Sequence, residues 1–290
     1  MTYHLHIGDY AYSSWSLRAW LLFDRFGIAT DTTLVDFLKG PVAGQMAHLS
    51  PVRTVPCLTT DDGTRIWDSI AIAEELASRH PDAGLWPSDP AARATARCLA
   101  AEMHSAFSAL RTDFPMNLQK AYTNVPVSEP VALDLQRLEV LWSTARRLHA
   151  SSEPWLCGAY SVVDAFFAPV AARIAGYDLA VSDLAQSYVT AHLGDPAFRR
   201  WRAMALARNS TLPWYSRDFA LADWPGPETL PARAVATGPS VNSTCPFSGR
   251  PVSHYAEIGD KVIGFCNPVC RDKAVADPEA WPQVIEVNQI

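Results

Sequence analysis

The chain has 290 residues, more than one average domain, and 49% of them are hydrophobic, enough to form a substantial core. A net charge of −6 without a Lys/Arg cluster argues against nucleic acid as a partner. The apolar stretches, such as 164–176, are broken by charge or proline before the roughly 20 residues that a membrane span requires. The segment 1–10 has no signal-peptide pattern. We therefore expect a cytoplasmic protein of two or more domains, with no membrane partner.

The first part of the chain alternates strand and helix patterns. Residues 3–9 alternate apolar and polar side chains, as in a half-buried strand. Apolar residues then recur at helical spacing after Ser13 and Ser14, either of which can cap the helix, and Gly27 follows its end. Further patterns complete the order βαβαββα: strands at 30–37, 55–60 and 64–68, a helical turn at 44–50 and a helix at 69–80.

Beyond a proline-containing linker at 80–93, no strand pattern stands out up to residue 222. Helical patterns cover 91–112, 129–150, 161–176 and 184–207. The segment 219–240 is rich in proline and glycine with little periodicity, which indicates a second linker. We therefore predict three domains, at residues 1–82, 91–222 and 241–290.

Ser13 and Ser14 stand where the first strand gives way to a helix. A serine there can simply cap the helix, which is worth about 1 kcal/mol. The same position suits an anion, because a helix N-terminus carries partial positive charge and free amides. A hydroxyl donor at that site could stabilise a thiolate, lowering a thiol pKa of roughly 8.5 by about two units.

Two dipeptides offer further contacts for a peptide ligand. A cis bond between Val55 and Pro56 would leave the Val55 amide and carbonyl free to pair with an extended peptide, although an ordinary loop proline is the plain alternative. Asp68 and Ser69 begin a helix, where a carboxylate can bind an ammonium and a hydroxyl can bind a carboxylate. A plain N-cap is the alternative here. Together with the serines, these residues describe a glutathione site.

The stretch YSSWSLRAW, residues 12–20, is similar to the serine-type motif of zeta-class glutathione transferases, with Trp15 in place of its cysteine. Residues 3–222 as a whole resemble a soluble glutathione transferase. The resemblance implies a thioredoxin-like N-terminal domain followed by an all-helical domain, and a homodimer. It implies that Ser14 or Ser13 activates the thiol, that Val55 and Pro56 contact the glutathione backbone, and that Asp68 and Ser69 contact its γ-glutamyl end. Thr54 departs from the pattern, which has glutamine.

The same resemblance assigns a structural role to Ser161 and Asp164, which would form a buried capping box. It also places a second substrate, a small electrophile, between the two domains. The residues that we expect to face this substrate are aromatic or polar: Tyr12, Trp15, His104, either Phe107 or Ser108, and Arg111. Arg111 could anchor an anionic group or form an interdomain ion pair, and His104 could equally be a structural histidine.

Three of the six cysteines lie close together near the C-terminus, an asymmetry that argues against a secreted disulfide framework. Twenty residues separate Cys245 from Cys266, and three separate Cys266 from Cys270. Three thiolates suit Zn²⁺ or Cu(I), and the spacing resembles the small TRASH/YHS-type metal-binding modules. We expect a small α+β module, with His254 or Asp272 as candidates for a fourth ligand. Packed, reduced cysteines without metal are the alternative.

The leading functional hypothesis is a glutathione transferase or glutathione-dependent isomerase, in which glutathione is the nucleophile and the protein supplies ionisation and proximity. The alternative is a non-catalytic scaffold with this fold, or a metal-handling protein that uses the C-terminal module.

Overall fold

A computed structural model describes residues 2–149 and 151–288 of the chain. It divides into two compact units. Unit 1 comprises Met1–Leu193 and Thr211–Pro225, and unit 2 comprises Gly194–Ser210 and Gly226–Ile290. Among the described helices, none combines the length and the apolar character needed to cross a membrane.

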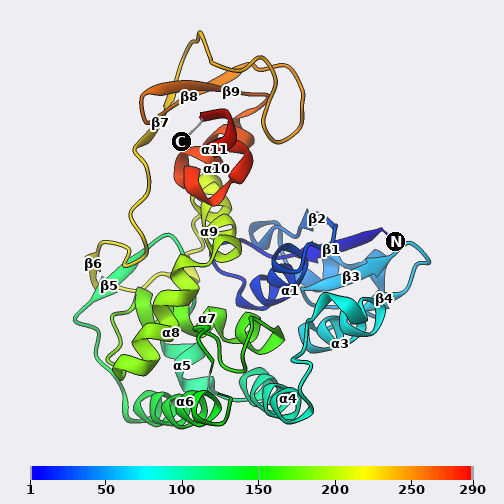
Figure 1. Cartoon of the computed structure of the whole chain (residues 1–290), viewed down its shortest axis with the longest axis vertical. Coiled ribbons are helices and arrows are strands. Elements are labelled where there is room, and N and C mark those ends of the chain that lie inside the picture. The colour runs from blue at the N-terminus through cyan, green and yellow to red at the C-terminus, as the bar shows by residue number, and fades with distance from the viewer. Residues whose placement is uncertain (1, 150, 289–290) are drawn as a thin grey trace. The chain divides into compact units, whose positions relative to one another are not determined.

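Unit 1 begins with the four-stranded sheet that the sequence predicts (Figure 1). The strand order is β2-β1-β3-β4, with β1 parallel to β2 and antiparallel to β3. The elements are β1 (Tyr3–Ile7), α1 (Ser14–Arg25), β2 (Asp31–Leu34), α2 (Val42–Gln45), β3 (Cys57–Thr60), β4 (Arg65–Ile66) and α3 (Ser69–Arg79). The order βαβαββα and the thioredoxin-like fold are thus confirmed. Short 3-10 helices lie in unit 1 at Phe37–Lys39, Ala47–Leu49, Pro81–Ala83 and Pro213–Tyr215, and in unit 2 at Pro278–Ala280.

Helix α1 is fixed by its start and by its apolar face. Ser13 is the N-cap, and its Oγ accepts a hydrogen bond from the Ser16 amide at 3.4 Å. Leu17 and Leu21 are fully buried on the face toward the core. Gly27 follows the helix with a φ of 65°, a left-handed conformation that glycine adopts without steric cost. The N-terminus of α1 is therefore held at the end of β1.

The rest of unit 1 is mainly helical and centres on α7. Its helices are α4 (Pro90–Ser105), α5 (Ser108–Asp113), α6 (Glu129–Leu148), α7 (Val162–Gly176) and α8 (Asp183–Gly194). Helix α7 is buried along nearly its whole length and packs against α1 and α4. The predicted capping box is present: Ser161 and Asp164 bond each other's backbone amides. Burial raises the pKa of Asp164 to about 6, although the hydrogen bonds that it accepts act in the opposite direction.

The helical part differs from the prediction in three places. The helix expected over 91–112 breaks at Phe107, which has a φ of 59°, and α5 starts anew with the Leu110 amide bonded to Asp134 of α6 at 2.9 Å. The helix expected over 184–207 breaks at Asp195, whose carboxylate caps α9 (Pro196–Arg208). Two short strands, β5 (Ala121–Thr123) and β6 (Ala220–Ala222), pair where no strand was expected. The predicted helix end at residue 150 lies outside the described residues.

Unit 2 contains a three-stranded antiparallel sheet in the order β7-β8-β9. Its elements are α9, β7 (Ala232–Val235), β8 (His254–Ile258), β9 (Lys261–Phe265), α10 (Pro268–Ala276) and α11 (Pro282–Asn288). The hairpin β8–β9 and the helix after Cys266 agree with the expected α+β module. Strand β7 lies within the segment 219–240, which the sequence predicted to be a linker, and it pairs with β8 along its whole length.

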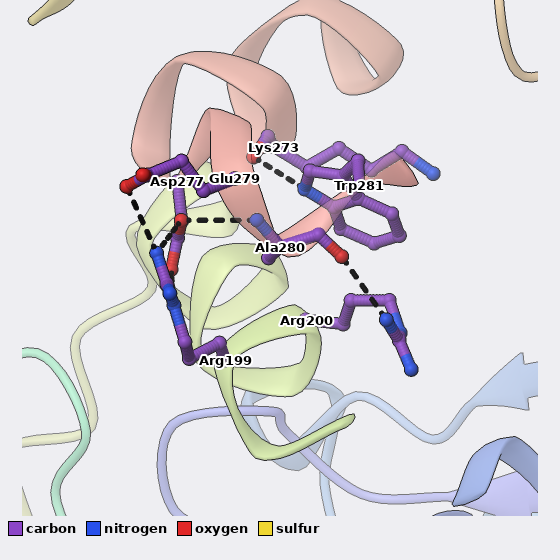
Figure 2. Close-up of polar contacts among 7 residues, drawn as sticks. All are labelled: Arg199, Arg200, Lys273, Asp277, Glu279, Ala280 and Trp281. Carbon is purple, nitrogen blue, oxygen red and sulfur yellow. Dashed lines mark hydrogen bonds and ion pairs between the residues drawn. The ribbon is translucent and has the colours of Figure 1, made fainter. Parts of the chain in front are cut away.

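Helix α9 belongs to the same core as the cysteine-containing module. Ala203 on α9 is buried in one apolar cluster with Phe265 and Trp281. Arg199 donates two hydrogen bonds to Asp277, at 2.8 and 2.7 Å, and Arg200 donates to the Ala280 carbonyl at 3.0 Å (Figure 2). The compact units therefore group α9 with residues 226–290, whereas the three domains predicted from sequence placed it in 91–222.

Candidate functional site

A pocket of about 620 Å³ lies within unit 1, at the N-terminus of α1. Its lining includes residues at the start of α1 and in the turn before β3. It also includes the N-cap residue of α3, residues of α5, one residue of α7, and Tyr215. Of the predicted residues, the lining includes Tyr12, Ser13, Ser14, Trp15, Val55, Pro56, Asp68, Arg111 and Ser108, the alternative to Phe107. Segments that are distant in sequence thus meet in a single cavity.

The two serines differ in what their hydroxyls are free to do. The Ser13 hydroxyl donates to Ser16 Oγ at 2.8 Å and accepts from the Ser16 amide, so it is occupied as a helix cap. The Ser14 Oγ accepts a long bond of 3.5 Å from Arg173 Nη2. No acceptor for the Ser14 hydroxyl proton is found among the described residues. Ser14 therefore offers a free donor to the pocket, whereas Ser13 does not.

Arg173 places a buried positive charge beside Ser14. Its Nε donates to the Phe114 carbonyl at 2.9 Å and its Nη1 donates to the Pro169 carbonyl at 3.0 Å. Burial, and then the nearby charge of Arg111, lower the pKa of Arg173 to about 10, so the side chain stays protonated at neutral pH. It has no carboxylate partner in the described part of the chain. A buried cation without an acid partner favours an anion in the adjacent pocket.

Trp15 is held between two guanidinium groups. The Arg18 guanidinium lies 4.4 Å and the Arg111 guanidinium 4.5 Å from the Trp15 ring centroid. Arg18 is fully buried, and burial lowers its pKa well below the usual value. Arg111 lines the pocket, and its stacking on Trp15 fixes the plane of its N–H groups. The ring thus positions a second cation at the pocket wall.

Val55 and Asp68 also line the pocket. The Val55–Pro56 bond is cis, and neither the amide nor the carbonyl of Val55 bonds to a described residue. Asp68 caps α3 through the Ile70 amide at 3.1 Å and lies 3.3 Å from His104 Nε2. The pocket therefore combines two arginines with one carboxylate.

Three of the predicted site residues do not line the pocket. Ser69 is fully buried, and its hydroxyl has no partner among the described residues. His104 instead pairs with Asp68, and burial lowers its pKa despite that carboxylate. Phe107 turns its ring into the core, being 3% exposed, because α4 ends at Ser105 and Phe107 adopts a left-handed backbone conformation. The continuous helical stripe on which His104 and Phe107 were predicted together does not form.

Several lining residues were missed by sequence reasoning. Arg173 is the clearest example of a missed residue. The sequence did contain a signal for it, because it is the one charged residue in the apolar stretch between Ala165 and Gly176. Thr54, which we noted only as a departure from the family pattern, also lines the pocket. Tyr215 follows the helical region, and its ring centroid lies 5.0 Å from that of Tyr12, a contact that no local pattern indicates.

A second cluster of reactive side chains lies in unit 2. The sulfur atoms of Cys245, Cys266 and Cys270 all lie within 4.8 Å of one another. Burial raises the pKa of Cys245, but hydrogen bonds from the amides of Cys266, Phe247 and Ser248 outweigh burial and lower it to about 7. Burial and the neighbouring Cys245 raise the pKa of Cys270 to about 11. The cysteines predicted as metal ligands therefore do converge.

Comparisons with known proteins find a family match in the N-terminal part of the chain. Residues 12–79 match the family described as glutathione S-transferase, N-terminal domain. A probable maleylacetoacetate isomerase of Caenorhabditis elegans is 35% identical over 86 residues, which cover 30% of this chain. The matched segment spans 39% of that curated relative's length.

Solved structures extend the likeness in fold. A glutathione transferase homologue from Burkholderia, with bound glutathione, has a TM-score of 0.55 at 23% identity and covers 72% of this chain and 100% of its own. Glutathione transferase Omega 2S from Trametes versicolor, in complex with 2,4-dihydroxybenzophenone, has a TM-score of 0.54 at 19% identity. It covers 69% of this chain and 93% of its own. At these identities, the likeness establishes the fold.

Proposed function

We propose that the protein is a glutathione-dependent transferase or isomerase. The match of residues 12–79 to the family described as glutathione S-transferase, N-terminal domain, and the fold that the chain shares with solved glutathione transferases support this proposal. Glutathione binds in the pocket of unit 1, and its sulfur attacks a small electrophile. The observation that carries the proposal is the free hydroxyl of Ser14, which lines the pocket beside a buried guanidinium.

The Ser14 hydroxyl and Arg173 act together on the glutathione thiol. When the thiol loses its proton to solvent, Ser14 donates its hydroxyl proton to the anionic sulfur in a charge-assisted hydrogen bond. Arg173 stabilises the same charge across the Ser14 oxygen, because its guanidinium is buried and stays protonated. Both interactions favour the thiolate over the thiol, so more of the bound glutathione is nucleophilic at neutral pH.

The remaining lining residues support a position for the tripeptide. The free amide and carbonyl of Val55 suit pairing with the extended glutathione backbone. The Asp68 carboxylate suits the γ-glutamyl ammonium. Ser69 contributes less directly than the family resemblance implies, since its hydroxyl is buried and does not line the pocket.

The second substrate is an anionic electrophile. Arg111 lines the pocket, and its guanidinium has no carboxylate partner among the described residues. Stacked on Trp15, it can bind a carboxylate through two parallel N–H groups. The homodimer that the resemblance implies and the cytoplasmic location expected from the sequence are part of the same proposal. They are tested by sedimentation and by cell fractionation.

A matched pair of electrophiles tests the proposal. Purified protein is assayed with glutathione and either a chloronitrobenzoate or its methyl ester, which differ only in the charged group. We expect conjugation of both, with a higher kcat/KM for the carboxylate. Arg111→Met should lower kcat/KM for the carboxylate by roughly tenfold or more and so remove the preference. The ester should be conjugated as before. No conjugation of either compound, and no retention on immobilised glutathione, would contradict the proposal and favour a scaffold.

The converging cysteines of unit 2 support a second function, metal binding. Three thiolates within this distance fit the donor set that Zn²⁺ or Cu(I) prefers. Cys245, Cys266 and Cys270 would hold the ion, which would supply a crosslink within a small module. Elemental analysis of the purified protein tests this: we expect one equivalent of metal, lost in Cys266→Ser. A metal-free, folded protein that takes up neither ion would contradict it.

A further inference from the structure

The cysteine cluster of unit 2 has a hydroxyl beside its sulfur atoms. Ser248 Oγ lies 3.1 Å from Cys266 Sγ, and the same hydroxyl hydrogen-bonds to Cys245. A tight turn holds Ser248 there: the amides of Ser248 and Gly249 donate to the Cys245 carbonyl at 3.3 and 2.9 Å. Gly249 closes the turn with a φ of 67°. The backbone thus directs the Ser248 oxygen toward two of the three sulfurs.

The two side chains that the sequence offered as a fourth ligand are engaged elsewhere. His254 Nδ1 lies 3.0 Å from Ser253 Oγ. Asp272 accepts a hydrogen bond from Arg271 Nε at 2.7 Å. Within the described residues, no histidine, aspartate or glutamate ligand atom joins the converging sulfurs. Asn267 also lies beside the cluster, but its Nδ2 donates to Cys266 Sγ at 3.2 Å and its Oδ1 accepts from the Cys270 amide. Ser248 Oγ is therefore the side-chain oxygen that the described residues offer next to the sulfurs.

The charge near the cluster favours a neutral group in that position. Lys273 Nζ lies 3.7 Å from the ring centroid of Phe247 and 4.3 Å from that of Trp281. Trp281 Nε1 donates to the Lys273 carbonyl at 3.0 Å, which fixes the ring against this side chain (Figure 2). Three thiolates and a divalent cation leave one negative charge, which the Lys273 ammonium balances. A fourth thiolate would leave one further negative charge unbalanced, so a thiol that binds in this position from solution is held weakly enough to exchange.

We propose that Ser248 marks an open fourth position, at which an external thiol binds a metal held by the three cysteines, so that the module exchanges its metal with small thiols. The proposal rests on the metal-binding function proposed above. Zinc sites closed by four strong protein ligands are structural, whereas sites with three protein ligands keep a position for an exchangeable one. Ser248 is exposed, and Cys266 and Cys270 are partly exposed, so an external ligand can reach the cluster. A thiol that bound there would release one proton to solvent and would transfer no electron, so the charge and the oxidation states would balance.

Cobalt(II) is the probe, because its charge-transfer absorption increases with the number of bound thiolates. The full-length protein, made metal-free with a phosphine reductant, is titrated with Co²⁺ and then with glutathione. We expect a three-thiolate spectrum in the wild type and in Ser248→Ala, and a rise of about one third in charge-transfer intensity on adding glutathione. Ser248→Cys should show the higher intensity from the start and should not respond to glutathione. It should release metal to a chelator about tenfold more slowly than the wild type.

A control variant and the following results test whether the fourth position is open. Ser243→Cys adds an exposed thiol in the same segment and should behave as the wild type. A wild-type spectrum in Ser248→Cys, or no response of the wild-type protein to glutathione, would overturn the open position while leaving metal binding intact. Failure of the wild type to bind Co²⁺ would overturn the metal function and, with it, this proposal.

Discussion

Replacing Arg173 by methionine should raise the pKa of the bound glutathione thiol. Arg173 Nη2 lies 3.5 Å from Ser14 Oγ. A sulfur that accepts a hydrogen bond from that oxygen lies about 3 Å further on, so the two charges are within about 6.5 Å of each other. With an effective dielectric constant of about 20, their attraction is roughly 2.5 kcal/mol, or close to two pKa units.

The assay is the pH dependence of kcat at saturating glutathione, with a neutral electrophile so that anion binding does not contribute. The apparent pKa should rise by about two units in Arg173→Met, and much less in Arg173→Lys, which keeps the charge. Arg137→Met, which removes an exposed arginine that pairs with Glu102, is the control and should leave the profile unchanged. Thermal unfolding checks that each variant is folded.

An unchanged pH profile in a folded Arg173→Met variant that still binds glutathione would refute the reasoning. In that case the buried guanidinium would serve only the carbonyls of Phe114 and Pro169. Its charge would then have no part in the chemistry.

Three further predictions concern stability. Arg199→Ala should destabilise unit 2 by roughly 3 kcal/mol, seen as faster hydrogen exchange in α10, because it leaves a buried Asp277 unpaired. Arg233→Ala breaks an exposed pair and should cost less than about 1 kcal/mol; equal effects would contradict this. Burial and two neighbouring histidines lower the pKa of His6 from 6.5 to about 4. The unfolded chain therefore binds the proton first, and stability should fall as the pH drops from 6.5 to 4, less steeply in His6→Gln. Asp164→Ala should cost roughly 3 kcal/mol in denaturant unfolding, because it removes the capping box; a loss below about 1 kcal/mol would count against that role.

The N-terminal fold was predictable because its signals are local. The alternation in β1, the helical spacing in α1 and the caps at Ser13 and Gly27 each concern a few neighbouring residues. The break at Phe107 was not predictable in this way, since the start of α5 depends on a carboxylate from α6, Asp134. The start of α9 was readable, because Asp195 precedes a proline at the first helical position.

The same difference between local signals and long-range contacts applies to the candidate site. Sequence placed Ser13 and Ser14 at the helix start but left open which one faces the ligand. The answer depends on Ser16, which engages Ser13, and on Arg173, which is 159 residues away from Ser14. In unit 2, the spacing of the three cysteines correctly predicted that their sulfur atoms converge. The fourth position followed from a backbone turn at Ser248, which spacing does not encode.

The ionisation of bound glutathione in two serine variants tests the central claim most directly. Thiolate absorbance of the protein–glutathione complex is titrated against pH for the wild type, Ser13→Ala and Ser14→Ala. We predict that Ser14→Ala raises the thiol pKa by about one to two units, the value of one charge-assisted hydrogen bond. Ser13→Ala should leave the thiol pKa nearly unchanged and lower the unfolding temperature instead. The reverse pattern, or a wild-type complex whose thiol titrates like free glutathione, would contradict the account.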